Sequence, residues 1–92
     1  MRAEDLLPDD QNQGLFNGTA VRKGTVGAFL INARMLIDPQ TPEHQRTAAT
    51  QDILQALPAL KALGLFELMQ VRDPRIRALC EHEQGIPPGI AL

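Results

Sequence analysis

The segment Cys80-Glu81-His82-Glu83 gathers a thiol, an imidazole and two carboxylates, which are groups that bind metals or take part in nucleophilic catalysis. On a helix, however, the side chains of Cys80 and His82 point about 200° apart, so they cannot bind one ion together. The chain has a single cysteine, which excludes an intrachain disulfide and a zinc site of paired cysteines. The sequence therefore favours a buried Cys80 beside a solvated helix face.

Cysteine catalysis would need a histidine beside Cys80 and a third group that orients its imidazole. The other histidine, His44, is predicted in the first turn of a helix, where the helix dipole disfavours an imidazolium. No local signature joins either histidine to Cys80. The sequence therefore favours a non-enzymatic role and predicts no catalytic, metal-binding or cofactor-binding residue.

Four glycines fall between residues 14 and 27 and raise the question of a phosphate-binding loop. Their spacing matches neither the Walker pattern nor the dinucleotide fingerprint, and turns of a short hairpin explain them. Gly24-Thr25 does open a predicted helix, and the N-terminus of a helix can hold an anion. An anion site at Lys23 and Thr25 is the best prediction of a small-ligand site.

Residues 58–77 offer a possible nucleic-acid contact, because they contain a helix, a glycine turn and then a second apolar segment, as helix-turn-helix domains do. The residues after Gly64, however, are Leu65, Phe66, Leu68 and Met69, which indicate core and not a base-reading surface. Arginines follow at positions 72, 75 and 77, but acidic residues stand four positions away from Arg77 on both sides, at salt-bridge spacing. Nucleic-acid binding is therefore the weaker alternative.

A helix is predicted over Thr25 to Ile37, with Thr25 as its N-cap and Asp38-Pro39 as its stop. It has two apolar sides. The side predicted to face the core carries Val26, Phe29, Leu30, Ala33, Leu36 and Ile37. The second side carries Ala28, Ile31 and Met35, with Asn32 beside it. Either the N-terminal arm or the last helix covers this second side, or it meets its own copy in a symmetric dimer.

The other elements follow from turn and cap residues. Asn17-Gly18 lies between short segments rich in β-formers and predicts a hairpin with a type I′ turn. Thr41-Pro42 predicts a helix from Pro42 to about Leu57, whose inward stripe is Ala49, Ile53, Ala56, Leu57, Leu60 and Leu63. Pro58 either kinks this helix or breaks it, so that a second short helix ends at Leu63.

After a C-terminal cap at Gly64, residues 65–69 are too few for periodicity to distinguish helix from strand. Asp73-Pro74 predicts the start of the last helix, which runs to Gln84 with Ile76, Leu79 and Cys80 inward and a cap at Gly85. The fold class is therefore mainly α, α+β in detail. We predict a compact bundle of three to four helices with a short N-terminal β-hairpin.

We expect one domain. Residues 1–13 are predicted to be a flexible acidic N-terminal arm, residues 14–86 a single globular domain and residues 87–92 a C-terminal tail. The chain is 43% hydrophobic and 22% charged, which is ordinary for a globular protein.

The chain has only three aromatic residues and a net charge of −2, and both argue against nucleic-acid partners. No apolar run approaches the roughly 20 residues of a membrane span, and the acidic start is unlike a signal peptide, so we expect a cytoplasmic protein.

Gly24-Thr25-Val26 with Asn32, Ala56-Leu57-Pro58 and the segment Gly64 to Leu68 together resemble a family of small uncharacterised bacterial proteins. The resemblance covers residues 15–69, and the motifs that carry it are a turn, a cap, a proline and a glycine stop. It implies one compact domain with a hairpin and helices, and it transfers no functional residue.

The function expected from the sequence is that of a protein-interaction or regulatory module acting as a homodimer, with the second side of the Thr25 to Ile37 helix as its interface. One alternative is a nucleic-acid-binding regulator that acts through residues 58–77. Another is a protein that binds a small anion at the junction of the hairpin and this helix.

Overall fold

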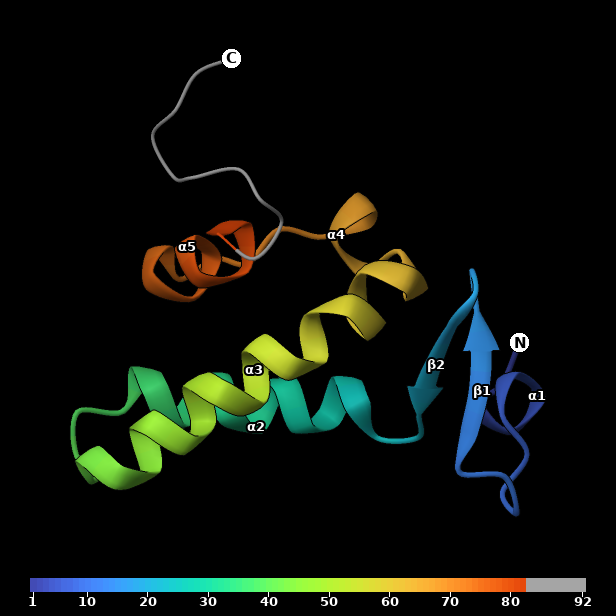
Figure 1. Cartoon of the computed structure of the whole chain (residues 1–92), viewed down its shortest axis with the longest axis horizontal. Coiled ribbons are helices and arrows are strands. Elements are labelled where there is room, and N and C mark those ends of the chain that lie inside the picture. Colours follow the sequence, from blue (N-terminus) through green and yellow to red (C-terminus); the bar gives the residue numbers. More distant parts are fainter. Residues whose placement is uncertain (83–92) are drawn as a thin grey trace.

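The computed structural model describes residues 1–82 and shows a two-stranded antiparallel hairpin beside a group of helices, which confirms the predicted fold class (Figure 1). The elements in chain order are α1 (Ala3–Leu6), β1 (Gln13–Phe16), β2 (Thr19–Arg22), α2 (Thr25–Ile37), α3 (Glu43–Leu63), α4 (Leu65–Leu68) and α5 (Pro74–His82). The predicted end of the last helix at Gln84, its cap at Gly85 and the tail 87–92 lie outside the described residues. Within residues 1–82, no helix is both long and apolar enough to cross a membrane.

The hairpin forms as predicted, with β1 and β2 paired from Gln13 opposite Arg22 to Phe16 opposite Thr19. Asn17 (φ 49°) and Gly18 (φ 79°) both take the left-handed conformation that a type I′ turn requires. The side-chain amide of Asn17 also donates a hydrogen bond of 2.6 Å to the carbonyl of Ala62. Carbonyls in the last turn of a helix lack an intrahelical partner, so this bond attaches the hairpin turn to the end of α3.

Helix α2 begins differently from the prediction. Gly24, not Thr25, is its N-cap, and it takes a left-handed conformation (φ 87°) that a β-branched threonine would adopt only with strain. Thr25 is the first helical residue, and its hydroxyl donates a 2.7 Å hydrogen bond to the carbonyl of Arg22. The helix ends at Ile37, before Asp38, as predicted.

The turn between α2 and α3 is held by Arg46, whose guanidinium donates to the carbonyls of Leu36 and Asp38 at 2.9 Å each. A cation at the C-terminal end of a helix interacts favourably with its dipole, so Arg46 stabilises the end of α2 from the start of α3. Helix α3 begins at Glu43, one residue later than predicted, because Pro42 has an extended backbone (ψ 150°).

Helix α3 continues unbroken through Pro58, so the alternative of a break there is wrong. Pro58 is exposed, whereas Leu57 and Leu60 beside it are fully buried. The backbone carbonyl that loses its partner to Pro58 can therefore bond with water, while packing on either side holds the helix together.

Helix α3 lies between α2 and α5 and supplies the centre of the core (Figure 1). Ile53, Leu57 and Leu60 are its largest fully buried residues, and the core cluster adds Phe29 from α2 with Ile76 and Cys80 from α5. The predicted stripe of α3 is thus confirmed at Ala49, Ile53, Leu57 and Leu60, whereas Ala56 and Leu63 are half-buried. Gly64 (φ 84°) ends α3 and directly precedes α4, so residues 65–68 are helical and not a strand.

The N-terminal segment contains one short helix, α1, and the side chain of Leu7 after it is buried. The ammonium of Lys23 donates a 2.8 Å hydrogen bond to the carbonyl of Pro8. These contacts attach the segment before the hairpin to the junction between β2 and α2.

Candidate functional site

Cys80, the first candidate for chemistry, is only 2% exposed, as predicted. Burial, together with the charge of Glu81, raises the pKa of the Cys80 thiol to about 11. A thiol is a poor nucleophile and metal ligand until it ionises, so Cys80 acts as a small core residue at neutral pH. In the part of the chain that the structure describes, no three His, Cys, Asp or Glu residues are grouped so that they could hold a metal ion.

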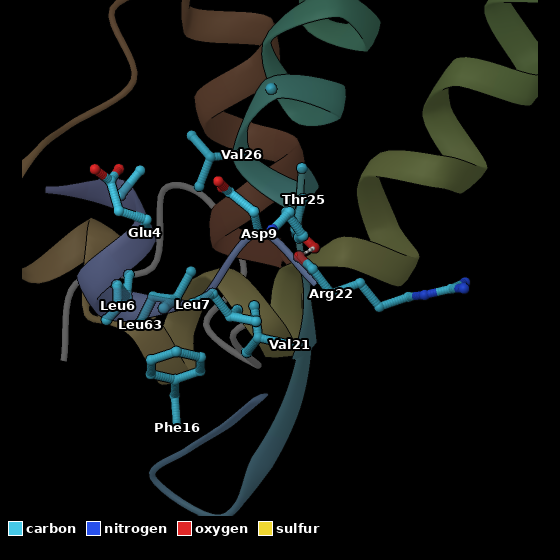
Figure 2. A pocket seen from close by; sticks show the side chains of 14 residues that line it. Glu4, Leu6, Leu7, Asp9, Phe16, Val21, Arg22, Thr25, Val26 and Leu63 are labelled. Atoms are coloured by element: carbon cyan, nitrogen blue, oxygen red, sulfur yellow. Dashed lines mark hydrogen bonds between the residues drawn. The ribbon is translucent and has the colours of Figure 1, made fainter. Parts of the chain in front are cut away.

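The predicted anion site lies beside a pocket of 310 Å³ at the junction of α1, the hairpin and α2 (Figure 2). Both residues of that prediction are engaged: the Lys23 ammonium bonds the Pro8 carbonyl, and the Thr25 hydroxyl bonds the Arg22 carbonyl. The carboxylates of Glu4 and Asp9 line the same pocket, and the side chain of Arg22 extends away from it (Figure 2). The anion site stays a prediction: Glu4 and Asp9 balance the charges of Arg22 and Lys23 in this lining, so it carries no net positive charge that would favour an anion.

A larger groove, with a volume of 580 Å³, runs between α2 and the segment from α4 to the start of α5. Its lining is almost entirely apolar. The rings of Phe29 and Phe66 meet edge to face in this region, with centroids 6.4 Å apart. On α2 the groove is bounded by Val26, Leu30 and Ile37, which are exposed.

The exposure of these three residues corrects the sequence analysis, which placed them on the core side of α2. Helices α4 and α5 pack against α3, and within residues 1–82 no element closes over this part of α2. Leu68 and Met69, also predicted as core, are exposed as well, Leu68 at 88%. Helix α4 is a single turn that follows α3. Leu65 and Phe66 in it pack against the core, whereas Leu68 and Met69 stay exposed.

The predicted interface residues divide into two groups. Ala28 and Ile31 are exposed, Ile31 at 63%, whereas Asn32 and Met35 are half-buried. Asn32 lines a small pocket toward α3. Neither α1 nor α5 covers Ile31, so the explanation by cover from the N-terminal arm or the last helix does not hold within residues 1–82.

The exposed side of α2 carries a regular stripe that the sequence analysis did not identify. Gly27, Leu30, Ile31 and Arg34 stand at positions i, i+3, i+4 and i+7, so their side chains share one face of the helix. All four are exposed, and Leu30 exposes 53% of its surface. We call this set the α2 stripe. Its spacing is present in the sequence, but the stripe combines Leu30 from one predicted apolar side and Ile31 from the other with Gly27 and Arg34 between them.

Two oppositely charged side chains near this stripe have no hydrogen-bond or ion-pair partner among residues 1–82. Arg34 is on the stripe itself, and Asp9 lines the pocket that also contains Gly27. By contrast, Glu4 on the same pocket is 3.4 Å from the guanidinium of Arg2. Opposite charges without internal partners near an exposed apolar stripe are suited to pairing across an interface.

The arginines of the nucleic-acid alternative do not form one exposed surface. Arg72 is exposed, Arg77 is half-buried, and Arg75 is paired with Asp73 at 3.3 Å. The short helix after the glycine turn, α4, has four residues, and apolar residues dominate it. This geometry gives no support to base reading by the segment 58–77.

Asp73 caps α5 as predicted, its carboxylate accepting hydrogen bonds from the backbone N–H groups of Arg75 and Ile76. The side-chain hydrogen bond from Arg75, followed by these N–H groups, holds the pKa of the Asp73 carboxyl below its ordinary value of 3.8. A carboxyl whose pKa is lower in the folded state stabilises the fold above its unfolded pKa, and this stabilisation is lost as the pH falls through the folded pKa.

We therefore expect Asp73→Asn to unfold at lower urea concentration than the wild type at about pH 6, and the difference to shrink at about pH 2.5. Urea titrations at both pH values measure it. A difference that stays constant with pH would contradict a charge-dependent cap, since asparagine keeps the cap oxygen and loses only the charge.

No family model matches the chain, and no curated protein or solved structure is significantly similar to it.

Proposed function

We propose that this chain is a non-enzymatic protein-interaction module that acts as a homodimer through the α2 stripe. The observation that supports this is the exposure of Leu30 and Ile31 at the centre of α2, with Val26 and Ile37 exposed beside them. Single exposed apolar residues are normal on a protein surface, but contiguous ones mark interaction sites.

The shape of the molecule agrees with this proposal. Its shortest extent is 19 Å, which is about the thickness of two packed helices. Within residues 1–82, no element covers Leu30 or Ile31 on the outer side of α2, so a partner can approach along the helix.

Apolar burial alone exceeds only the lower part of the range of association costs and supports at most a weak, reversible dimer. Burying a Leu or Ile side chain fully is worth about 1.5–3 kcal/mol, so covering a half-exposed one gains about 1 kcal/mol. Four such residues from each copy together contribute about 8 kcal/mol, which is comparable with the roughly 4–15 kcal/mol that association costs in lost freedom of motion. We accordingly expect a dimer whose population depends on protein concentration.

Sedimentation equilibrium over a range of concentrations tests the proposal with the variant Ile31→Asp. A charge at the centre of the stripe would be buried without a partner in the dimer, so we expect at least about tenfold weaker association. The exposed position should leave the circular dichroism spectrum unchanged, and also the melting transition at protein concentrations where the wild type is monomeric.

Leu15→Asp is the matched control. Leu15 is an exposed apolar residue of the hairpin, 76% exposed, and the same substitution there should leave the association constant unchanged. A wild-type chain that stays monomeric at the highest concentration, or an Ile31→Asp variant that associates as strongly as the wild type, would refute the homodimer.

A further inference from the structure

The α2 stripe is nearly symmetric about its own midpoint, which lies between Leu30 and Ile31. Gly27 and Arg34 stand at equal distances from this midpoint on opposite sides. When two copies of a helix pack antiparallel about a twofold axis, positions equally far from the midpoint face each other across the interface. Gly27 of one copy would therefore face Arg34 of the other.

Gly27 has no explanation within its own chain. It is the third residue of α2, in the first turn, where glycine is a poorer helix former than alanine, and a Cβ added there would meet no atom within 4 Å. Neither a close contact nor a left-handed backbone requires glycine at this position. A position without a side chain on an exposed helix face does, however, leave space for a long side chain of a neighbouring helix.

Arg34 supplies such a side chain, and its guanidinium has no ion-pair partner in residues 1–82. Gly27 and Asp9 line the same pocket, and the carboxylate of Asp9 lies on the side of this pocket where Val26 stands in the first turn of α2 (Figure 2). An arginine that passes over Gly27 toward the pocket would reach a carboxylate that is itself unpaired. Apolar fit and charge complementarity thus indicate the same alignment.

We infer that the two α2 helices of the homodimer pack antiparallel, with Arg34 of each copy lying over Gly27 of the partner subunit and pairing with the partner's Asp9. The twofold axis makes this contact twice. Antiparallel helices also place opposite ends of their dipoles together. This inference rests on the proposed function, because it specifies the alignment of the same interface.

Charge reversal tests the ion pair. We expect Arg34→Glu to weaken the dimer by about 5- to 10-fold, because two pairs are lost and two like-charged contacts replace them. Asp9→Arg should weaken it similarly, and the double variant Arg34→Glu/Asp9→Arg should regain most of the wild-type affinity. High salt should weaken the wild type and have less effect on Arg34→Ala.

Arg72→Glu is the matched control, since Arg72 is an exposed arginine on the rim of the groove with no ion pair among the described residues. It carries the same change of charge in the groove that Arg34 also lines, but outside the pocket of Gly27 and Asp9, and should leave the association constant unchanged. An equal effect of Arg72→Glu, or no recovery in the double variant, would overturn the ion pair.

Disulfide cross-linking tests the alignment independently of charge. A chain with Gly27→Cys and a tagged chain with Arg34→Cys are mixed and oxidised, and we expect the mixed disulfide to form faster than either disulfide between identical chains. The native Cys80 does not compete because it is buried. Faster cross-linking between two Gly27→Cys chains would indicate a different alignment and overturn the inference.

The two levels of the proposal fail in different ways. Loss of association in Ile31→Asp without any effect of charge reversal or preference for the mixed disulfide would refute the alignment and leave the homodimer standing. A wild-type chain that is monomeric throughout would refute both.

Discussion

Leu60→Ala is expected to lower the free energy of unfolding by about 3 kcal/mol, because removing a buried leucine loses its transfer free energy and leaves a cavity. Leu60 is fully buried in α3 and belongs to the core cluster, which also contains Ile76 and Cys80 of α5 and against which Leu65 of α4 packs. Guanidinium titration of the variant and the wild type at one protein concentration measures the change. Equal concentrations are needed because dimerisation also contributes to apparent stability.

Leu68→Ala is the matched control for this experiment. It makes the same chemical change at a leucine that is 88% exposed, only eight positions further along the chain. We expect a change within about 0.5 kcal/mol. If both variants lost similar stability, α4 would have to be buried against something other than residues 1–82, and the described core would be incomplete.

Gly64→Val is expected to cost about 2–3 kcal/mol of folding free energy. Gly64 joins α3 to α4 in a left-handed conformation (φ 84°), which is strained for any residue with a Cβ and most of all for a β-branched one. An added Cβ would also lie 2.8 Å from a carboxylate oxygen of Glu67. Because this residue sets the direction of α4, the groove wall formed by Leu65 and Phe66 should shift as well.

Gly64→Asn provides the comparison, since asparagine tolerates the left-handed conformation better than other residues with a side chain. We expect it to lose clearly less stability than Gly64→Val in thermal unfolding, although it adds a Cβ in the same place. Equal losses in both variants would show that the contact with Glu67, and not the backbone conformation, makes glycine necessary.

The sequence predicts the elements of this fold well where local chemistry determines them. Asn17-Gly18 specifies the hairpin turn, Gly64 the end of α3, and Asp73 the start of α5. The apolar stripe of α3 identifies Ile53, Leu57 and Leu60 as core. Each of these predictions depends on interactions within a few residues or on the period of one helix.

The burial of α2 could not be predicted in the same way. Periodicity shows which sides of a helix are apolar, but not which of them the rest of the chain covers. Here α5 follows α3 and packs on it, so Leu30 stays exposed although it belongs to an apolar side. Of the two alternatives at Pro58, a kink or a break, the break is wrong for a related reason, because packing of Leu57 and Leu60 holds α3 together where local rules allow an interruption.

The hydrogen bond from Asn17 to α3 limits which residues can stand at position 17 more than the hairpin turn alone would. Asparagine and aspartate serve almost equally well before glycine in a type I′ turn. In this fold, however, the amide of Asn17 donates to the Ala62 carbonyl at the negative end of α3. An aspartate would preserve the turn while placing a second negative group against that carbonyl, so two residues that are interchangeable in most hairpins are not interchangeable here.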